Sequence, residues 1–283
     1  MPATYTPIRY PGGKTKLYPV VSQIIHDNFD NRCTYIEPFA GGAGLAIKLL
    51  VLNDVEKIII NDIDRAVYSM LDCIVNRSEE LIAFIESTEI SVNEWRRQRE
   101  IYRDASEREL EELGFAAFYL NRTNRSGILS GGLIGGESQN GDYDMSARFN
   151  INNLVKKIRV IARLRDRITV LNMDAFKMLD LAIFQNDQSF AYFDPPYVQK
   201  GPGLYANSFD DDDHRRLGKM ITKCSCRWIV TYDPCSLVEE IYTGLPCQKV
   251  TVNYSAHQVK NGQEYLISGK NTKLFGGATT TIL

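Results

Sequence analysis

The stretch from residue 34 to residue 62 constrains the fold more than any other part of the chain. Residues 34–37 are typical of a short strand, residues 38–44 are rich in glycine, and the apolar residues that follow are typical of a helix. A second apolar run, residues 57–61, ends at Asp62. A strand, a glycine turn, a helix and a second strand make the first half of a nucleotide-type βαβ unit. We therefore expect an α/β protein built on a mostly parallel sheet.

Asp62 adds a functional signal to this unit. It lies 21 residues after Gly41, about the spacing at which an acid accepts hydrogen bonds from the ribose hydroxyls of a bound nucleotide. The glycine turn alone could serve only to pack the helix against the strand. The turn and the acid together favour an adenosine-containing ligand.

The tetrapeptide Asp194-Pro195-Pro196-Tyr197 is where we expect the chemistry. It follows residues 190–193, an apolar run typical of a buried strand. Two consecutive prolines lack backbone N–H groups, so the chain must leave the strand end in a rigid, extended segment. The Asp194 side chain and the Pro195 carbonyl are then two fixed acceptors close to the ring of Tyr197. Such a set suits a planar heterocycle that carries an amino group.

Two segments predict contacts with nucleic acid. Residues 121–127 cluster Asn and Arg before a glycine-rich loop, and these side chains pair bidentately with adenine and guanine edges. A polar surface loop would have the same composition, and the residues alone do not decide between the two. Residues 148–167 carry seven Lys or Arg and one acid, with an apolar stripe of helical period. Lys156 and Lys157 then lie on exposed faces, which favours phosphate contacts over an idle basic face.

Composition excludes several classes of protein. The 283 residues are enough for one large α/β domain or a core domain with an insertion. No run of about 18 apolar residues and no secretion signal is present, so we expect a soluble cytoplasmic protein without a membrane segment. Cys224 and Cys226 lack a second pair, which favours reduced thiols over a metal site. Gly13-Lys14-Thr15 mimics a P-loop tail, but the full motif needs a glycine where this chain has Ile8.

The remaining strand patterns lie in the C-terminal half. Residues 168–171 and 227–231 read as further strands, separated by helical segments. Residues 247–254 and 264–268 alternate like a β-hairpin, with a turn signal at Asn261-Gly262.

Four segments in this order closely resemble the DNA adenine methylase family, the alpha-class, D12-type N6-adenine methyltransferases that depend on S-adenosyl-L-methionine. They are Tyr10-Pro11-Gly12-Gly13-Lys14, residues 37–44, Asn61-Asp62-Ile63-Asp64 and the tetrapeptide at residues 194–197. The resemblance implies a Rossmann-like, seven-stranded sheet with helices on both faces and an antiparallel final hairpin. It also implies a catalytic domain of residues 1–75 and 151–283, with a mainly helical target-recognition domain inserted at residues 76–150.

The resemblance also implies roles for individual residues. Asp194 and the Pro195 carbonyl would accept the N6 hydrogens of a flipped-out adenine, Pro196 would keep the segment rigid, and Tyr197 would stack on the base. S-adenosyl-L-methionine would be bound, without any metal, by Tyr10, Lys14, Glu37, Pro38, Phe39, Gly41, Asp62, Asp174 and Asp194. Within this set, Tyr10 and Lys14 would contact the methionine end, Asp62 the ribose and Asp174 the adenine moiety. DNA would be contacted by Arg122, Asn124, Arg125, Ser126, Lys156 and Lys157.

We therefore expect double-stranded DNA as the substrate of a monomeric enzyme. The context stays open between restriction-modification with a cognate restriction enzyme as partner, a phage genome and cell-cycle control. An RNA N6-adenine methyltransferase would use the same chemistry and stays open. Cytosine-N4 enzymes more often carry Ser in place of Asp194, and glutamine methyltransferases more often carry Asn. A nicotinamide dehydrogenase would not explain the tetrapeptide, and a catalytically silent DNA-binding relative would not need it. Residues 126–132 do not match the loop of GATC-reading enzymes well, so the target sequence stays open.

Overall fold

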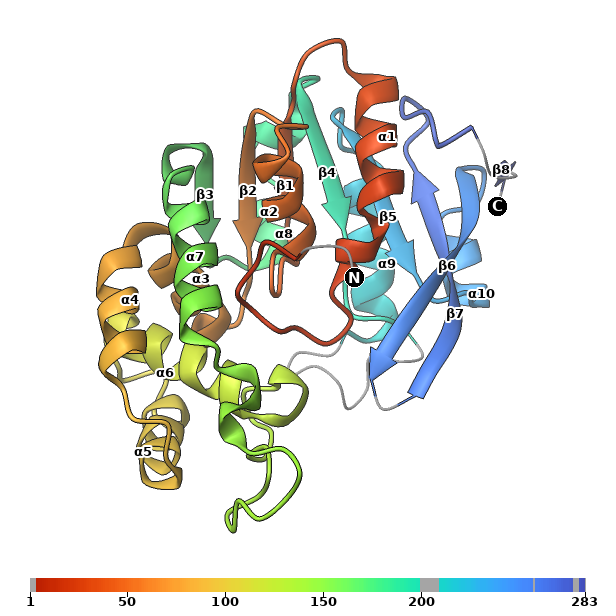
Figure 1. The fold of residues 1–283 in the computed structure, drawn as a ribbon. Helices are drawn as coiled ribbons and strands as arrows, with labels where there is room; N and C mark the ends of the chain where they lie inside the picture. The colour runs from red at the N-terminus through yellow and green to blue at the C-terminus, as the bar shows by residue number, and fades with distance from the viewer. Residues whose placement is uncertain (1–3, 199–208, 257, 277–279, 283) are drawn as a thin grey trace.

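The computed structural model describes residues 4–198, 209–256, 258–276 and 280–282. These residues form one sheet with the strand order β3-β2-β1-β4-β5-β7-β6-β8 and with helices on both faces (Figure 1). The seven expected strands and the antiparallel final hairpin are confirmed, and the short β8 extends the sheet. The strands are β1 (Thr34–Glu37), β2 (Lys57–Asn61), β3 (Ile168–Leu171), β4 (Ser189–Phe193), β5 (Arg227–Tyr232), β6 (Pro246–Ala256), β7 (Gln258–Ser268) and β8 (Thr280–Ile282).

The first five strands are parallel. Strand β1 pairs with both β2 and β4, β2 pairs with β3, and β4 pairs with β5. The strand order reverses between β1 and β4, so the crevice outside the carboxyl ends of these two strands is the expected ligand site of an open α/β sheet.

The position of the final turn differs from the sequence prediction. Strand β6 pairs with β7 from Cys247 opposite Ile267 to Ala256 opposite Gln258, so the ladder continues past residues 261 and 262. The predicted turn at Asn261-Gly262 is wrong, because Asn261 pairs within the ladder. Where β7 pairs with β5, Leu266 faces the core on one side of the sheet and Ile267 faces the core on the other, so a slip by one residue would exchange the two side chains between the cores.

Alternate residues of the central strands bury against different helices. On β4, Phe190 and Tyr192 face the core formed with α1, α2, α3 and α7, whereas Ala191 and Phe193 face the core formed with α8, α9 and α10. The helices are η1 (Lys14–Leu17), α1 (Tyr18–Asn28), α2 (Gly44–Val51), α3 (Arg65–Asn76), α4 (Ser78–Ser87), α5 (Val92–Arg103), α6 (Leu110–Thr123), η2 (Arg125–Gly127), η3 (Met145–Arg148), α7 (Ile151–Ala162), η4 (Arg165–Arg167), α8 (Ala175–Met178), η5 (Ala182–Gln185), α9 (Asp211–Ile221) and α10 (Ser236–Ile241). No helix in the described parts of the chain is long and apolar enough to cross a membrane.

The segment between α3 and α7 is helical but does not have a core of its own. Leu81, Trp95 and Leu113, from α4, α5 and α6, belong to the same continuous apolar core as the helices on the first face of the sheet. Figure 1 shows α4, α5 and α6 gathered beyond the β3 edge, with the β6–β7 hairpin at the opposite edge. The segment therefore packs onto the helices that cover the sheet, with α6 against α3.

Gly114 makes the close contact between α3 and α6 possible. A Cβ there would lie 2.6 Å from the Ser69 carbonyl oxygen and closer still to Cys73 Sγ. Alanine normally stabilises a helix interior by about 1 kcal/mol relative to glycine. Because overpacking costs about 1–3 kcal/mol, we expect Gly114→Ala instead to lower the free energy of unfolding, measured by urea denaturation. Gly276→Ala is the matched control, since its Cβ would meet nothing within 4 Å. A Gly114→Ala protein as stable as the wild type would contradict this account of the helix contact.

Candidate active site

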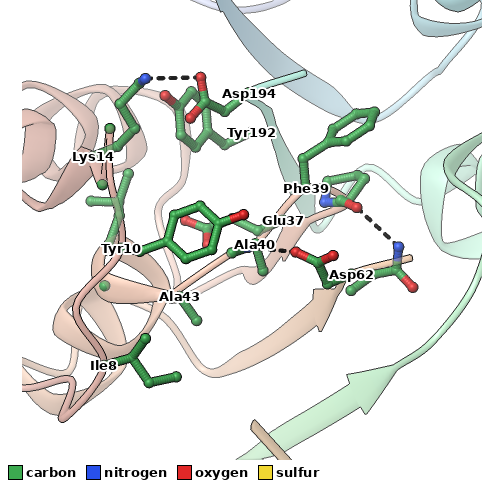
Figure 2. A pocket seen from close by; sticks show the side chains of 18 of the residues that line it. Ile8, Tyr10, Lys14, Glu37, Phe39, Ala40, Ala43, Asp62, Tyr192 and Asp194 are labelled. Carbon is green, nitrogen blue, oxygen red and sulfur yellow. Dashed lines mark hydrogen bonds and ion pairs between the residues drawn. The ribbon is translucent and has the colours of Figure 1, made fainter. Parts of the chain in front are cut away.

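A cavity of about 660 Å³ opens at the carboxyl ends of β1, β2 and β4. Segments far apart in the sequence line it: the N-terminal loop, the glycine turn, the end of β2 and the residues that follow β3 and β4. Figure 2 shows the Lys14–Asp194 pair and Asp62 on opposite sides of the Tyr10 ring. The structure thus brings together in one cavity all nine predicted cofactor-binding residues, namely Tyr10, Lys14, Glu37, Pro38, Phe39, Gly41, Asp62, Asp174 and Asp194.

The glycine turn lets the N-terminal loop lie directly on the end of β1. The Tyr10 ring packs on Gly41 and Gly42, and a Cβ on Gly41 would lie 2.6 Å from that ring. Gly41 also has a φ of 49°, a conformation that side chains other than glycine rarely adopt. Both the space and the backbone conformation therefore require glycine at position 41.

Asp62 is fixed by backbone donors. Its Oδ2 accepts the Gly41 N–H at 2.9 Å and its Oδ1 accepts the Asp64 N–H at 2.9 Å. Burial raises the pKa of Asp62 to about 6. Each carboxylate oxygen has a second lone pair for a further donor, so Asp62 can still receive hydroxyl groups of a ligand.

Asn61 holds three strand ends together, a role that the sequence analysis did not assign. Its Nδ2 donates to the Pro38 carbonyl at 2.9 Å and to the Met173 carbonyl at 3.0 Å, and its Oδ1 accepts the Met173 N–H at 2.8 Å. Asn61 is buried at the end of a strand, where a polar side chain needs partners. That position was the available signal for a structural role at the site.

An aromatic group closes the cavity near Asp174. The Phe209 ring lies 6.0 Å from the Phe39 ring and 5.6 Å from the Phe176 ring, measured between centroids. The Asp174 Oδ1 caps α8 by accepting the N–H groups of Phe176 and Lys177. Phe209 lines the cavity but belongs to no motif, so the sequence offered no reason to select it.

The tetrapeptide follows β4 directly and belongs to no helix or strand. Asp194 and Pro196 line the cavity, whereas Pro195 and Tyr197 are buried and lie outside its lining. The Lys14 ammonium lies 3.0 Å from Asp194 Oδ1 and 4.7 Å from the centroid of the Tyr197 ring. Burial, and then the negative charges of Asp194 and Glu264, raise the pKa of the Tyr197 phenol. Stacking of Tyr197 on a base and acceptance of a hydrogen by the Pro195 carbonyl therefore stay predictions.

Two of the residues predicted to contact DNA make hydrogen bonds within the fold. Asn124 is fully buried: its Oδ1 accepts the Trp95 indole N–H at 2.7 Å, and its Nδ2 donates to the carbonyls of Ile128 and Leu129. With its amide donor and acceptor both engaged in the fold, Asn124 has a structural role in place of the predicted base contact.

Arg122 is similarly committed. Its guanidinium donates to the carbonyls of Pro7 and Arg148, so it ties the N-terminal segment to the end of the inserted helices. Burial, reinforced by the neighbouring charges of Arg9 and Arg148, lowers the pKa of Arg122 to about 10. These bonds leave two of the five guanidinium N–H groups for a ligand, so a contact of Arg122 with DNA stays a prediction.

The other predicted DNA contacts lie on the surface outside the cavity. Arg125 and Lys156 are exposed, and Ser126 is partly exposed. Lys157 is partly buried and donates to Thr4 Oγ1 and to the Thr6 carbonyl.

Four cations gather beside the N-terminal segment, namely Arg9, Arg122, Arg148 and Lys157. Burial and the nearby Arg148 lower the pKa of Arg9, and burial together with Arg122 lowers that of Lys157. Within the described residues, no ion pair joins any of the four to an acid. Because like charges held together repel each other, this cluster favours an anionic partner.

Glu37 predicts a pH dependence of stability. Burial, with a smaller contribution from Asp194, raises its pKa from 4.5 to about 8, while the Tyr35 hydroxyl donates to Oε1 at 2.8 Å. A raised pKa adds stability that is fully present below pH 4.5 and is lost as the pH rises towards 8. Glu37→Gln stays neutral, so the melting temperature of the wild type should fall relative to this variant across that window. Asp62 is present in both proteins, so its own effect on stability cancels in the comparison. A difference in melting temperature that does not change with pH would contradict the raised pKa of Glu37.

Comparison with known proteins places the chain in a family. The D12 class N6 adenine-specific DNA methyltransferases match residues 10–261. The type II methyltransferase M.MjaIII of Methanocaldococcus jannaschii is 26% identical over 238 residues, which cover 78% of this chain and 80% of that protein.

Among solved structures, the rRNA methyltransferase AviRa of Streptomyces viridochromogenes has a TM-score of 0.39 and 11% identity, covering 93% of this chain and 86% of that one. The glycopeptide N-methyltransferase MtfA, complexed with S-adenosyl-L-methionine, has a TM-score of 0.32 and 10% identity, covering 91% and 78%. These scores are too low to support a functional argument. The family match, in contrast, covers residues 10–261, which is most of the chain. This protein therefore belongs to the D12 class of N6 adenine-specific DNA methyltransferases, a family that implies S-adenosyl-L-methionine as cofactor and DNA as substrate.

Proposed function

We propose that this chain transfers the methyl group of S-adenosyl-L-methionine to N6 of a flipped-out adenine at a specific sequence in duplex DNA. The observation that supports this proposal is the single cavity into which Asp62 and Asp194 both open. These acids follow β2 and β4, which lie on either side of β1 next to the reversal of strand order. A cofactor held at Asp62 and a base held at Asp194 would therefore share one enclosed space.

The residues around Asp62 fit a nucleoside cofactor. The turn at Gly41 lets the Tyr10 ring pack on the end of β1, Asp62 can receive ribose hydroxyls, and Asp174 retains acceptor capacity for an adenine amino group. Phe39 and Phe209 offer apolar rings for the purine, and Tyr10 borders the path towards Asp194. When bound, the cofactor supplies a methyl group already activated on a sulfonium.

The task of the protein at Asp194 is to make N6 a nucleophile. The N6 lone pair of adenine is delocalised into the ring, which makes the amine a poor nucleophile. Asp194 and the Pro195 carbonyl would accept its two hydrogens and favour a tetrahedral amine with the lone pair directed at the methyl group. The new nitrogen–carbon bond forms in line as the carbon–sulfur bond breaks, and N6 gives up one proton for which the Asp194 carboxylate is the acceptor at hand. Such a displacement needs positioning and electrostatics more than a strong base.

We propose that residues 76–150 form the target-recognition domain and that residues 1–75 and 151–283 form the catalytic domain. Arg125 and Ser126 lie exposed or partly exposed after α6 and are our candidates for base contacts. Lys156 and the four-cation cluster next to the N-terminal segment would bind phosphates. We further propose that the protein acts as a monomer, and the type II relative supports a cognate restriction enzyme as partner.

Asp194→Ala should reduce methyl transfer by about 10²–10³-fold or more, because it removes one of the two acceptors for the N6 hydrogens. Tritiated methyl transfer from S-adenosyl-L-methionine to unmethylated genomic DNA measures the rate. The variant should stay folded by circular dichroism, since Asp194 is partly exposed and Lys14 keeps Glu264 as a partner. Near-normal turnover in Asp194→Ala would show that the argument about N6 activation is wrong.

Arg125→Ala and Lys156→Ala should separate base recognition from phosphate binding. We expect Arg125→Ala to reduce discrimination against a mismatched site by about 1–3 kcal/mol. Lys156→Ala should weaken binding equally on all duplexes and reduce the slope of log affinity against log salt by about 1. Fluorescence anisotropy on duplexes with and without the methylated sequence, at several salt concentrations, measures both. If the two variants weaken every duplex alike, Arg125 does not read a base.

A further inference from the structure

Two donors hold the Asp194 carboxylate, and both bind the same oxygen. Lys14 Nζ and Thr231 Oγ1 each lie 3.0 Å from Asp194 Oδ1. No residue in the described ranges donates a hydrogen bond to Oδ2. Asp194 lines the cavity, so one oxygen is committed to the protein while the other is left for a ligand.

The direction of the hydrogen bonds at Thr231 follows from its single hydroxyl hydrogen. Asp194 is ion-paired with Lys14, so its carboxylate accepts and Thr231 must donate to it. The Thr231 oxygen then accepts from the Tyr192 hydroxyl, 2.8 Å away. Thr231 is fully buried on β5, and its branched side chain has restricted rotation in a strand. Its hydroxyl is therefore a fixed donor.

Glu264 holds the second donor in place. Its Oε1 lies 3.6 Å from Lys14 Nζ, and Glu264 is fully buried on β7, the strand next to β5. Lys14 is only 7% exposed, so its ammonium depends on carboxylate partners. With Glu264 as a second partner, the ammonium stays at Asp194 Oδ1 and does not move across to Oδ2.

We propose that Thr231 and Glu264 are positioning residues for methyl transfer. Thr231 donates to Asp194 Oδ1 and Glu264 holds the Lys14 ammonium at the same oxygen, so that Oδ2 alone faces the substrate amine. Neither residue lines the cavity, so both act through Asp194. The inference deepens the proposed function and rests on it, because it assumes that Asp194 accepts a hydrogen from the methylated amine.

Thr231→Val tests the first half of the proposal, since valine keeps the shape and removes the donor. We expect the single-turnover rate of methyl transfer to fall by about 10-fold or more, as for a misplaced catalytic group, with the dissociation constants for DNA and cofactor unchanged. Thr231→Ser, which keeps the hydroxyl, should recover most of the rate. A purely structural role would lower the melting temperature of Thr231→Val without this separation of rate from binding. An unchanged rate in Thr231→Val overturns the proposal.

Glu264→Gln tests the second half. It removes the charge that holds Lys14 while keeping the size of the side chain, and it should also lower the single-turnover rate without weakening DNA binding. Because both residues orient one carboxylate, the double variant should lose about as much as the more severe single variant. Independent, additive losses would overturn the joint role.

A crystal structure of Thr231→Val separates failure of this inference from failure of the proposed function. If the wild type does not methylate DNA, the proposed function fails, yet the orientation of Asp194 can still be measured. The proposal predicts that the carboxylate rotates or takes two orientations once the hydroxyl is lost. An Asp194 carboxylate oriented as in the wild type overturns the inference, whatever the substrate is.

Discussion

The parallel pairing of five strands is the constraint on which the candidate site depends. Because β1, β2, β3, β4 and β5 run the same way, the polar residues that follow them meet at one edge of the sheet. Glu37, Asp62, Asp174 and Asp194 come from four different strand ends and line one cavity. The Asn61 side chain then ties the ends of β1 and β2 to the segment after β3. The glycine turn completes the site by admitting Tyr10.

The N-terminal segment connects this cavity to the inserted helices. The Asn121 side chain accepts the Arg9 N–H and donates to the Arg9 carbonyl, and a Cβ on Gly127 would lie 2.5 Å from that carbonyl. Arg9 is therefore held against the end of α6, one residue before Tyr10 enters the cavity. If DNA binds at the loop after α6, as we propose, it would lie next to the segment that carries Tyr10 into the cavity.

Sequence patterns predicted the elements and most of the cavity, because apolar runs and motifs are local signals. The strand runs are found where expected, and the nine residues predicted to contact the cofactor all line the cavity. Thr231, Glu264 and Phe209 escaped prediction because they reach the site from other elements, without a short-range pattern. Asn124 and Arg122 were assigned to DNA on composition, whereas folding turns their donors onto backbone carbonyls. The hairpin turn was misplaced because a local glycine signal was weaker than the pairing of β7 with β5.

The central claim is that the reacting atom is N6 of adenine in DNA. The most direct test is to incubate the protein with S-adenosyl-L-methionine and unmethylated DNA, digest the product to nucleosides and identify the methylated species by mass spectrometry. The account predicts N6-methyldeoxyadenosine, formed at one sequence and absent when Asp194 is replaced by alanine. N4-methyldeoxycytidine as the product, or methylation of RNA with none of DNA, would contradict it.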